Sequence, residues 1–156
     1  MRTFKLSLVA VLAILLQVAG LQADDDKIPL DKLPKAVLEA VKAKYKGAEL
    51  VEASKEVEKN VTSYEVIIKF KGEKLEVTLT SDGKNEAVER EMEAKDLPKA
   101  VSDSIKAKYD GYTISKVEEV TKGETVTYEI LVKKGDKKVE LTIGKDGKIT
   151  EAKEEK

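Results

Sequence analysis

A phrase near the start of this chain is repeated 64 residues further on, and this repetition constrains the fold more than any other feature. Residues 32–45 read KLPKAVLEAVKAKY and residues 96–109 read DLPKAVSDSIKAKY. When 31–92 is aligned with 95–156 without a gap, about 20 of the 62 pairs are identical. The matches include proline, tyrosine, glycine and an Asp-Gly dipeptide in register, which a composition rich in Lys and Glu would not produce. The spacing therefore predicts a duplicated unit.

Each predicted unit opens with a helix, because apolar residues recur at four-residue steps and so share one helix face. Pro34 suits the first helical position, where its missing N–H is not needed. Gly47 follows the last periodic residue and suits the left-handed position that ends a helix. The apolar stripe consists of Leu33, Val37, Val41 and Tyr45 in the first unit and Leu97, Val101, Ile105 and Tyr109 in the second.

The pattern then changes to an alternation of apolar and polar residues, which indicates strands with one face on a core. Asp82-Gly83 and Asp146-Gly147 lie between alternating runs and are typical of hairpin turns. The clearest strands cover 62–70, 75–79, 126–132 and 139–143, and weaker ones cover about 48–57, 85–90, 112–121 and 148–153. The sequence therefore predicts an α+β fold of two tandem repeats, each a helix packed on a three- to four-stranded antiparallel sheet.

The first 23 residues have the order of a secretory signal peptide. Arg2 and Lys5 precede an apolar stretch, and a small residue, Ala23, stands before the acidic run that opens the mature chain. The alternative is a membrane anchor, for which this uncharged stretch is borderline in length. The predicted organisation is a signal peptide at 1–23, an acidic leader at 24–30, a first repeat at 31–92 and a second repeat at 95–156.

The absence of cysteine and histidine excludes several classes of function. An exported chain without cysteine has no disulfides, so packing alone must hold it. Zinc, copper, haem and iron–sulfur sites lose their usual ligands, and Ser–His and Cys–His nucleophile pairs cannot form. The sequence predicts no catalytic residue, no cofactor and no metal site, and hence no enzyme.

The charge balance argues against a nucleic-acid partner. Without Arg2 and Lys5, 27 basic residues face 30 acidic ones, a net charge of about −3. No basic patch is interleaved with aromatic residues, so nothing would attract or stack a nucleic acid. After signal cleavage the remaining chain carries no segment that we expect to enter a membrane.

Two aliphatic residues stand out on the strand face opposite the predicted core. Ile67 and Leu131 occupy equivalent places in the two repeats, and charged residues surround both. Docking between the repeats, a surface for a partner, or scattered exposed aliphatics that need no explanation would each account for them. The candidate partner-binding residues are Ile67, Leu131, Glu65, Lys69, Glu129 and Lys133.

The repeat resembles a known family. A helix that opens LP..AV and ends in Y.G, followed by a meander with an xDGK hairpin, resembles the PepSY-like, beta-lactamase-inhibitor-like domain of exported bacterial proteins. The resemblance covers 31–92 and 95–156. It implies a helix on a four-stranded antiparallel sheet, often in tandem, outside the cytoplasm, without enzymatic activity. It also implies a link to inhibition or regulation of secreted enzymes.

This chain departs from the inhibitor that lends the family its name, which has disulfides and an aromatic-rich binding face. Here cysteine is absent, and the mature chain has no tryptophan and one arginine, Arg90. Tryptophan, tyrosine and arginine are the residues that usually dominate protein interfaces. The family name therefore describes the expected fold rather than an inhibited target.

These observations predict a non-catalytic, periplasmic or secreted binding module that engages another exported or envelope protein through its sheet faces. Inhibition or regulation of that protein is the finer version of this hypothesis. The alternative is a small structural or stress-response protein of the envelope with weak cation or cell-wall contacts. The sequence names neither the partner nor the oligomeric state.

Overall fold

The computed structural model describes residues 26–58 and 60–155. The predicted signal peptide, 1–23, lies outside the described residues, as does the start of the predicted acidic leader. None of the helices in the described part of the chain is long and apolar enough to cross a membrane.

Apart from β1, the two halves of the chain present the same succession of elements. The N-terminal half, 26–91, contains β1 (Asp26–Lys27), the 3-10 helix η1 (Leu30–Lys32), α1 (Lys35–Lys44), β2 (Glu49–Glu58), β3 (Val61–Phe70), β4 (Glu73–Thr80) and β5 (Asn85–Glu91). The C-terminal half, 94–155, contains η2 (Ala94–Asp96), α2 (Lys99–Lys108), β6 (Thr113–Lys122), β7 (Thr125–Lys134), β8 (Lys137–Gly144) and β9 (Ile149–Glu155). Most of the described chain is strand, and both α-helices are short.

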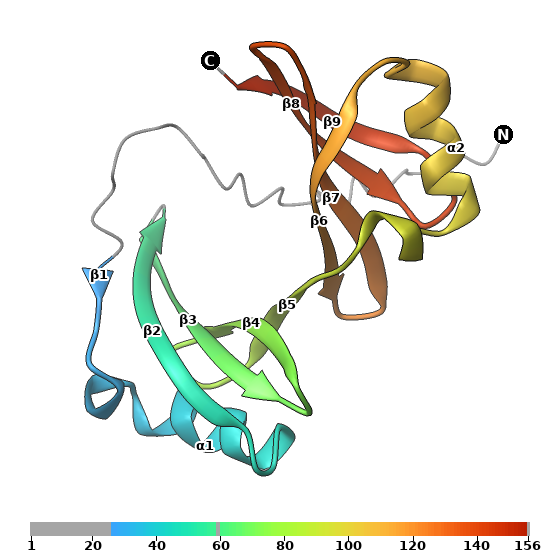
Figure 1. Ribbon diagram of the computed structural model, residues 1–156. Helices are drawn as coiled ribbons and strands as arrows, with labels where there is room; N and C mark the ends of the chain where they lie inside the picture. The colour runs from blue at the N-terminus through green and yellow to red at the C-terminus, as the bar shows by residue number, and fades with distance from the viewer. Residues whose placement is uncertain (1–25, 59, 156) are drawn as a thin grey trace, which may run out of the picture.

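The predicted architecture of two repeats, each with its own helix-covered sheet, is wrong. All nine strands form one antiparallel sheet in the order β1 to β9, with the two halves as lobes joined through β5 (Figure 1). The join, which we call the β5–β6 seam, pairs four residues of each strand, from Val88 with Thr121 to Glu91 with Glu118. An edge strand offers unpaired N–H and C=O groups to any neighbour. The last strand of one half therefore pairs with the first long strand of the next.

Both helices pack against the same face of this sheet. One line of facing residues crosses the seam from Leu75 through Arg90 and Glu119 to Tyr128. The two core clusters lie on this helix-covered face, one under each helix. The main buried residues are Val37, Val41, Val66, Ile68, Val77 and Leu79 in the first cluster and Val101, Ile105, Ile130, Val132, Leu141 and Ile143 in the second. The opposite, helix-free face is therefore shared by both halves.

The Asp-Gly turns pack closely against the first turns of the helices. Gly83 has φ +83° and its N–H donates to the carbonyl of Thr80 at 2.9 Å. A Cβ at this position would lie 2.5 Å from the carbonyl oxygen of Ala36 in the first turn of α1. Gly147 meets α2 in the same way, so glycine is required for both its conformation and its small size. Pro34 stands one place earlier than predicted, as the residue that precedes the helix.

Candidate functional site

The sequence-predicted partner-binding residues all lie on the helix-free face. Lys69 is exposed and the other five are half-buried. Ile67 stands opposite Glu52 on one side and Glu76 on the other. Leu131 stands between Lys116 and Glu140 in the same manner. Charged neighbours thus separate the two aliphatic residues, and they do not form one apolar patch.

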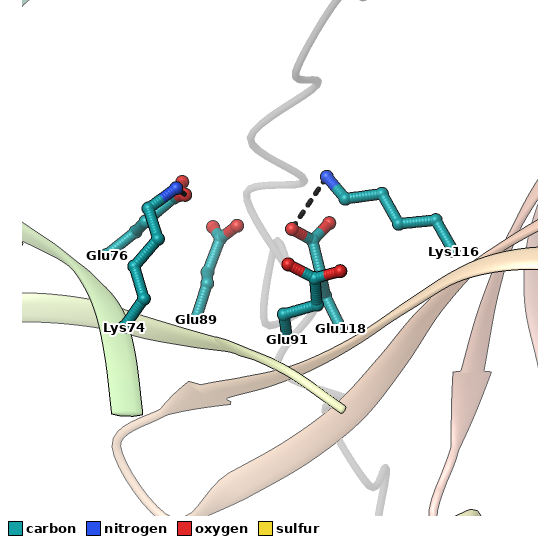
Figure 2. A pocket seen from close by; sticks show the side chains of 6 residues that line it. All are labelled: Lys74, Glu76, Glu89, Glu91, Lys116 and Glu118. Carbon is teal, nitrogen blue, oxygen red and sulfur yellow. Dashed lines mark hydrogen bonds and ion pairs between the residues drawn. The ribbon is translucent and has the colours of Figure 1, made fainter. Parts of the chain in front are cut away.

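A shallow hollow of about 90 Å³ lies on this face at the β5–β6 seam (Figure 2). Strands β4, β5 and β6 contribute its walls, and four carboxylates point into it beside two lysines. The lining residues are Lys74, Glu76, Glu89, Glu91, Lys116 and Glu118. We call this the seam hollow. None of its six residues was among the sequence-predicted site residues, because the hollow exists only once β5 pairs with β6.

Each lysine of the hollow is already committed to one glutamate. Lys74 Nζ lies 2.7 Å from Glu76 Oε1, and Lys116 Nζ lies 2.7 Å from Glu118 Oε1. The hydrogen bond to Glu76 raises the pKa of Lys74. Burial lowers the pKa of Lys116, but the hydrogen bond and charge of Glu118 outweigh it, so this pKa is raised too. Both lysines therefore stay charged and each neutralises one carboxylate.

Glu89 is the unusual member of the hollow. Glu89, Glu118 and Glu129 each place one carboxylate oxygen within 4.8 Å of the others. Burial, followed by the charges of Glu129 and Glu118 and then of Glu76 and Glu65, raises the pKa of Glu89 to about 7. Burial also raises the pKa of Glu129. The structure thus brings the predicted residues Glu65 and Glu129, from opposite halves, into electrostatic contact with one group that the sequence did not single out.

The carboxylate cluster has limited chemistry available to it. Its groups can accept hydrogen bonds, bind a proton, or attract a lysine or arginine of another molecule. Calcium takes six to eight oxygen ligands, whereas each of these three carboxylates brings one oxygen into the cluster, so we assign no metal to them. A positively charged side chain or a proton would relieve the repulsion within the cluster.

The other face of the seam has the opposite character. Arg90 of β5 donates to Glu119 of β6 at 3.0 Å and to Glu73 of β4 at 3.2 Å. This pairing joins the two halves through unlike charges on the helix-covered face. At the seam, an ion pair therefore links β5 to β6 on the helix-covered face, while like charges lie together on the helix-free face.

A second hollow, of about 480 Å³, lies beside α2 in the C-terminal half. Ala94 and Ser102 are part of its lining, and the residues 64 places earlier are the larger Leu30 and Leu38. Tyr109 and Tyr112 pack edge to face at 5.5 Å within the same lining. The hollow thus lies where two smaller side chains occur in this half, and nothing in the described chain indicates what would fill it.

Comparison with solved structures shows a shared fold. A protein from Bacteroides eggerthii, described as one of the "putative periplasmic proteins", is 19% identical with a TM-score of 0.68, over 78% of this chain and 88% of that one. A BLIP-like protein from Bacteroides fragilis is 22% identical with a TM-score of 0.62, over 76% and 84%. A DUF2874 family protein from Bacteroides uniformis is 17% identical with a TM-score of 0.68, over 78% and 88%.

Comparison with known families is more specific. Nothing among the curated proteins matches this chain. The family described as "Putative beta-lactamase-inhibitor-like, PepSY-like" matches residues 21–86 and, in a second and overlapping alignment, residues 62–151. Together these segments span most of the chain, and the class they represent is non-catalytic. The chain therefore belongs to the PepSY-like, beta-lactamase-inhibitor-like family, as the repeated LP..AV helix and xDGK turn predicted.

Proposed function

We propose that this chain is an exported, non-catalytic binding module that engages a basic segment of another exported or envelope protein and thereby regulates it. Membership of the family supports the absence of catalysis. The periplasmic description of the Bacteroides eggerthii protein and the signal-like order of residues 1–23 support export. The surface used is the helix-free face of the sheet.

One observation carries this proposal: the helix-free face continues across both halves and gathers carboxylates at its centre. Glu89, Glu118 and Glu129 lie close together there, with half-buried Ile67 and Leu131 on the same face. Lysine or arginine side chains of a partner would neutralise the cluster, and their methylene stems would cover the two aliphatic residues. Complementary charge would give the partner its orientation and a fast association.

The alternative, a structural or stress-response protein of the envelope, needs no selective partner. A charged face would then serve solubility and weak contacts only. No particular group of residues favours this alternative, so it becomes an outcome of the test.

The test uses the mature chain, residues 24–156, as bait for proteins of the exported fraction, followed by binding measurements with the captured partner. The double variant Ile67→Lys/Leu131→Lys keeps the strand pattern and places two positive charges on the helix-free face. We expect binding to weaken at least tenfold, about 1.4 kcal/mol. The free energy of unfolding should change by less than about 0.5 kcal/mol, as for other surface substitutions.

A matched control places the same charges elsewhere. Ala43 and Ala107 are exposed at equivalent places on α1 and α2, away from the helix-free face, so Ala43→Lys/Ala107→Lys should leave binding unchanged. Equal loss of binding in both double variants would mean that the helix-free face is not the binding surface. A partner that binds both variants like the wild type would also remove the helix-free face as the binding surface, and the absence of any specific partner would favour the envelope alternative.

A further inference from the structure

The two halves differ in charge at one equivalent cross-strand pair. In the C-terminal half Glu140 of β8 stands opposite Lys153 of β9, a pair of unlike charges. The position 64 residues earlier pairs Glu76 of β4 with Glu89 of β5, two like charges. Like charges directly opposite each other destabilise a sheet. A repulsive pair of β4 and β5 thus lies beside the β5–β6 seam, where the equivalent pair at the outer edge of the sheet is attractive.

Among the described residues, no lysine or arginine pairs with Glu89. Lys74 and Lys116, the cations of the seam hollow, already pair with Glu76 and Glu118. The charged groups around Glu89 are Glu65 on β3, Lys74 and Glu76 on β4, Glu91 on its own strand, Lys116 and Glu118 on β6, and Glu129 on β7.

We propose that the β5–β6 seam is a proton switch, in which Glu89 holds a proton under mildly acidic conditions and releases it as the pH rises through neutrality. Release leaves the seam hollow one charge more negative and the junction between the halves less stable. The effect on the seam depends only on the geometry of the cluster. A further consequence, tighter binding of a basic partner at higher pH, rests on the proposed function.

The direction of the effect on stability follows from linkage. The pKa of Glu89 is raised from 4.5 to about 7, chiefly by burial and then by the neighbouring carboxylates. Between these two values the folded protein binds a proton that the unfolded chain has lost, so stability falls as the pH rises. The stabilising contribution of the proton is complete below about 4.5 and is lost by the time the pH has passed about 7.

The first experiment needs no partner. NMR of the carboxyl carbon of Glu89 across pH 4 to 9 should give a midpoint near 7 rather than near its ordinary value. Urea unfolding at pH 5.5 and 8 compares the wild type with Glu89→Gln, which cannot release a proton. Glu89→Gln should gain stability relative to the wild type at both pH values, and more at pH 8 than at pH 5.5. Glu39→Gln, an exposed helix residue, should show no such difference.

A second variant, Glu89→Lys, tests the proposal independently of Glu89→Gln. Glu89→Lys copies the C-terminal half, where lysine faces glutamate, and should be more stable than the wild type at pH 8. A midpoint for Glu89 near 4.5, or variants that follow the same pH dependence as the wild type, would overturn the proton switch.

The third experiment measures the binding of an octalysine peptide at pH 6 and 8 at constant salt. The wild type should bind more tightly at pH 8 by about threefold, the effect of one additional screened charge pair. Glu89→Gln should lose this dependence and Glu39→Gln should keep it. Absent binding combined with a midpoint near 7 would sustain the proton switch and count against the proposed function. Binding that is equally strong at both pH values in the wild type would overturn the link between switch and partner.

Discussion

At the β5–β6 seam, the two faces of the sheet carry different arrangements of charge. On the helix-covered face, Arg90 ties β5 to Glu119 of β6, and apolar clusters lie under α1 and α2 on either side. On the helix-free face, Glu89 meets Glu118 and Glu129 with no cation of its own among the described residues. The comparison teaches that packing and unlike charges on one face can carry the fold. The other face then retains like charges that cost stability and that we propose to serve binding.

The largest expected effect comes from placing a charge in the helix-covered face. Val37 and Val101 are fully buried on α1 and α2. Val37→Asp and Val101→Asp should each lower the free energy of unfolding by about 3–5 kcal/mol, because an unpaired carboxylate is costly to bury. Urea unfolding measures the loss. A harmless substitution in either helix would show that its half does not depend on the buried cluster, and the contrast between the faces would fail there.

The contact between turn and helix should give a smaller effect on the same face. Gly83 and Gly72 both have positive φ, but only a Cβ on Gly83 would meet the backbone of α1. Gly72→Ala should cost about 1 kcal/mol for its left-handed backbone, and Gly83→Ala about 2–3 kcal/mol because overpacking is added. Thermal and urea unfolding of the pair isolate the contact. If the two substitutions cost the same, the turn does not hold α1 to the sheet.

The smallest effect in this series concerns the seam itself. Arg90→Ala removes the link from β5 to β6 and should cost about 1 kcal/mol, near the upper end for partly exposed ion pairs. Lys95→Ala removes a pair with Glu93 in which both side chains are 71% exposed, and should cost less than about 0.5 kcal/mol. Equal losses, measured at low and high salt, would mean that the arginine contributes no more than an ordinary surface charge.

Local periodicity predicted individual elements well. The apolar stripe from Leu33 to Tyr45 indicated a helix, and α1 occupies Lys35–Lys44 within it. Alternation also indicated the strands, including the weak segment at 85–90 that forms β5. These predictions succeed because helix and strand each impose their own spacing on the residues that face a core.

The same periodicity could not predict which strands pair with each other. The alternation in β5 and β6 shows which side chains share a face, but backbone N–H and C=O groups pair in the same way with any neighbouring strand. The expected pair of separate sheets was therefore wrong. The seam hollow was missed for the same reason, since its residues come from β4, β5 and β6.

The sequence by itself determined the family, the face assignment of Glu65, Ile67, Glu129 and Leu131, and the absence of histidine and cysteine chemistry. Each of these depends on residue identity and local spacing alone. Only the tertiary structure decided that β5 joins β6, that both helices cover one face, and that Glu89 sits among carboxylates from other strands. The electrostatic environment of a side chain depends on distances and burial across the whole sheet, and these exist only after the strands have paired.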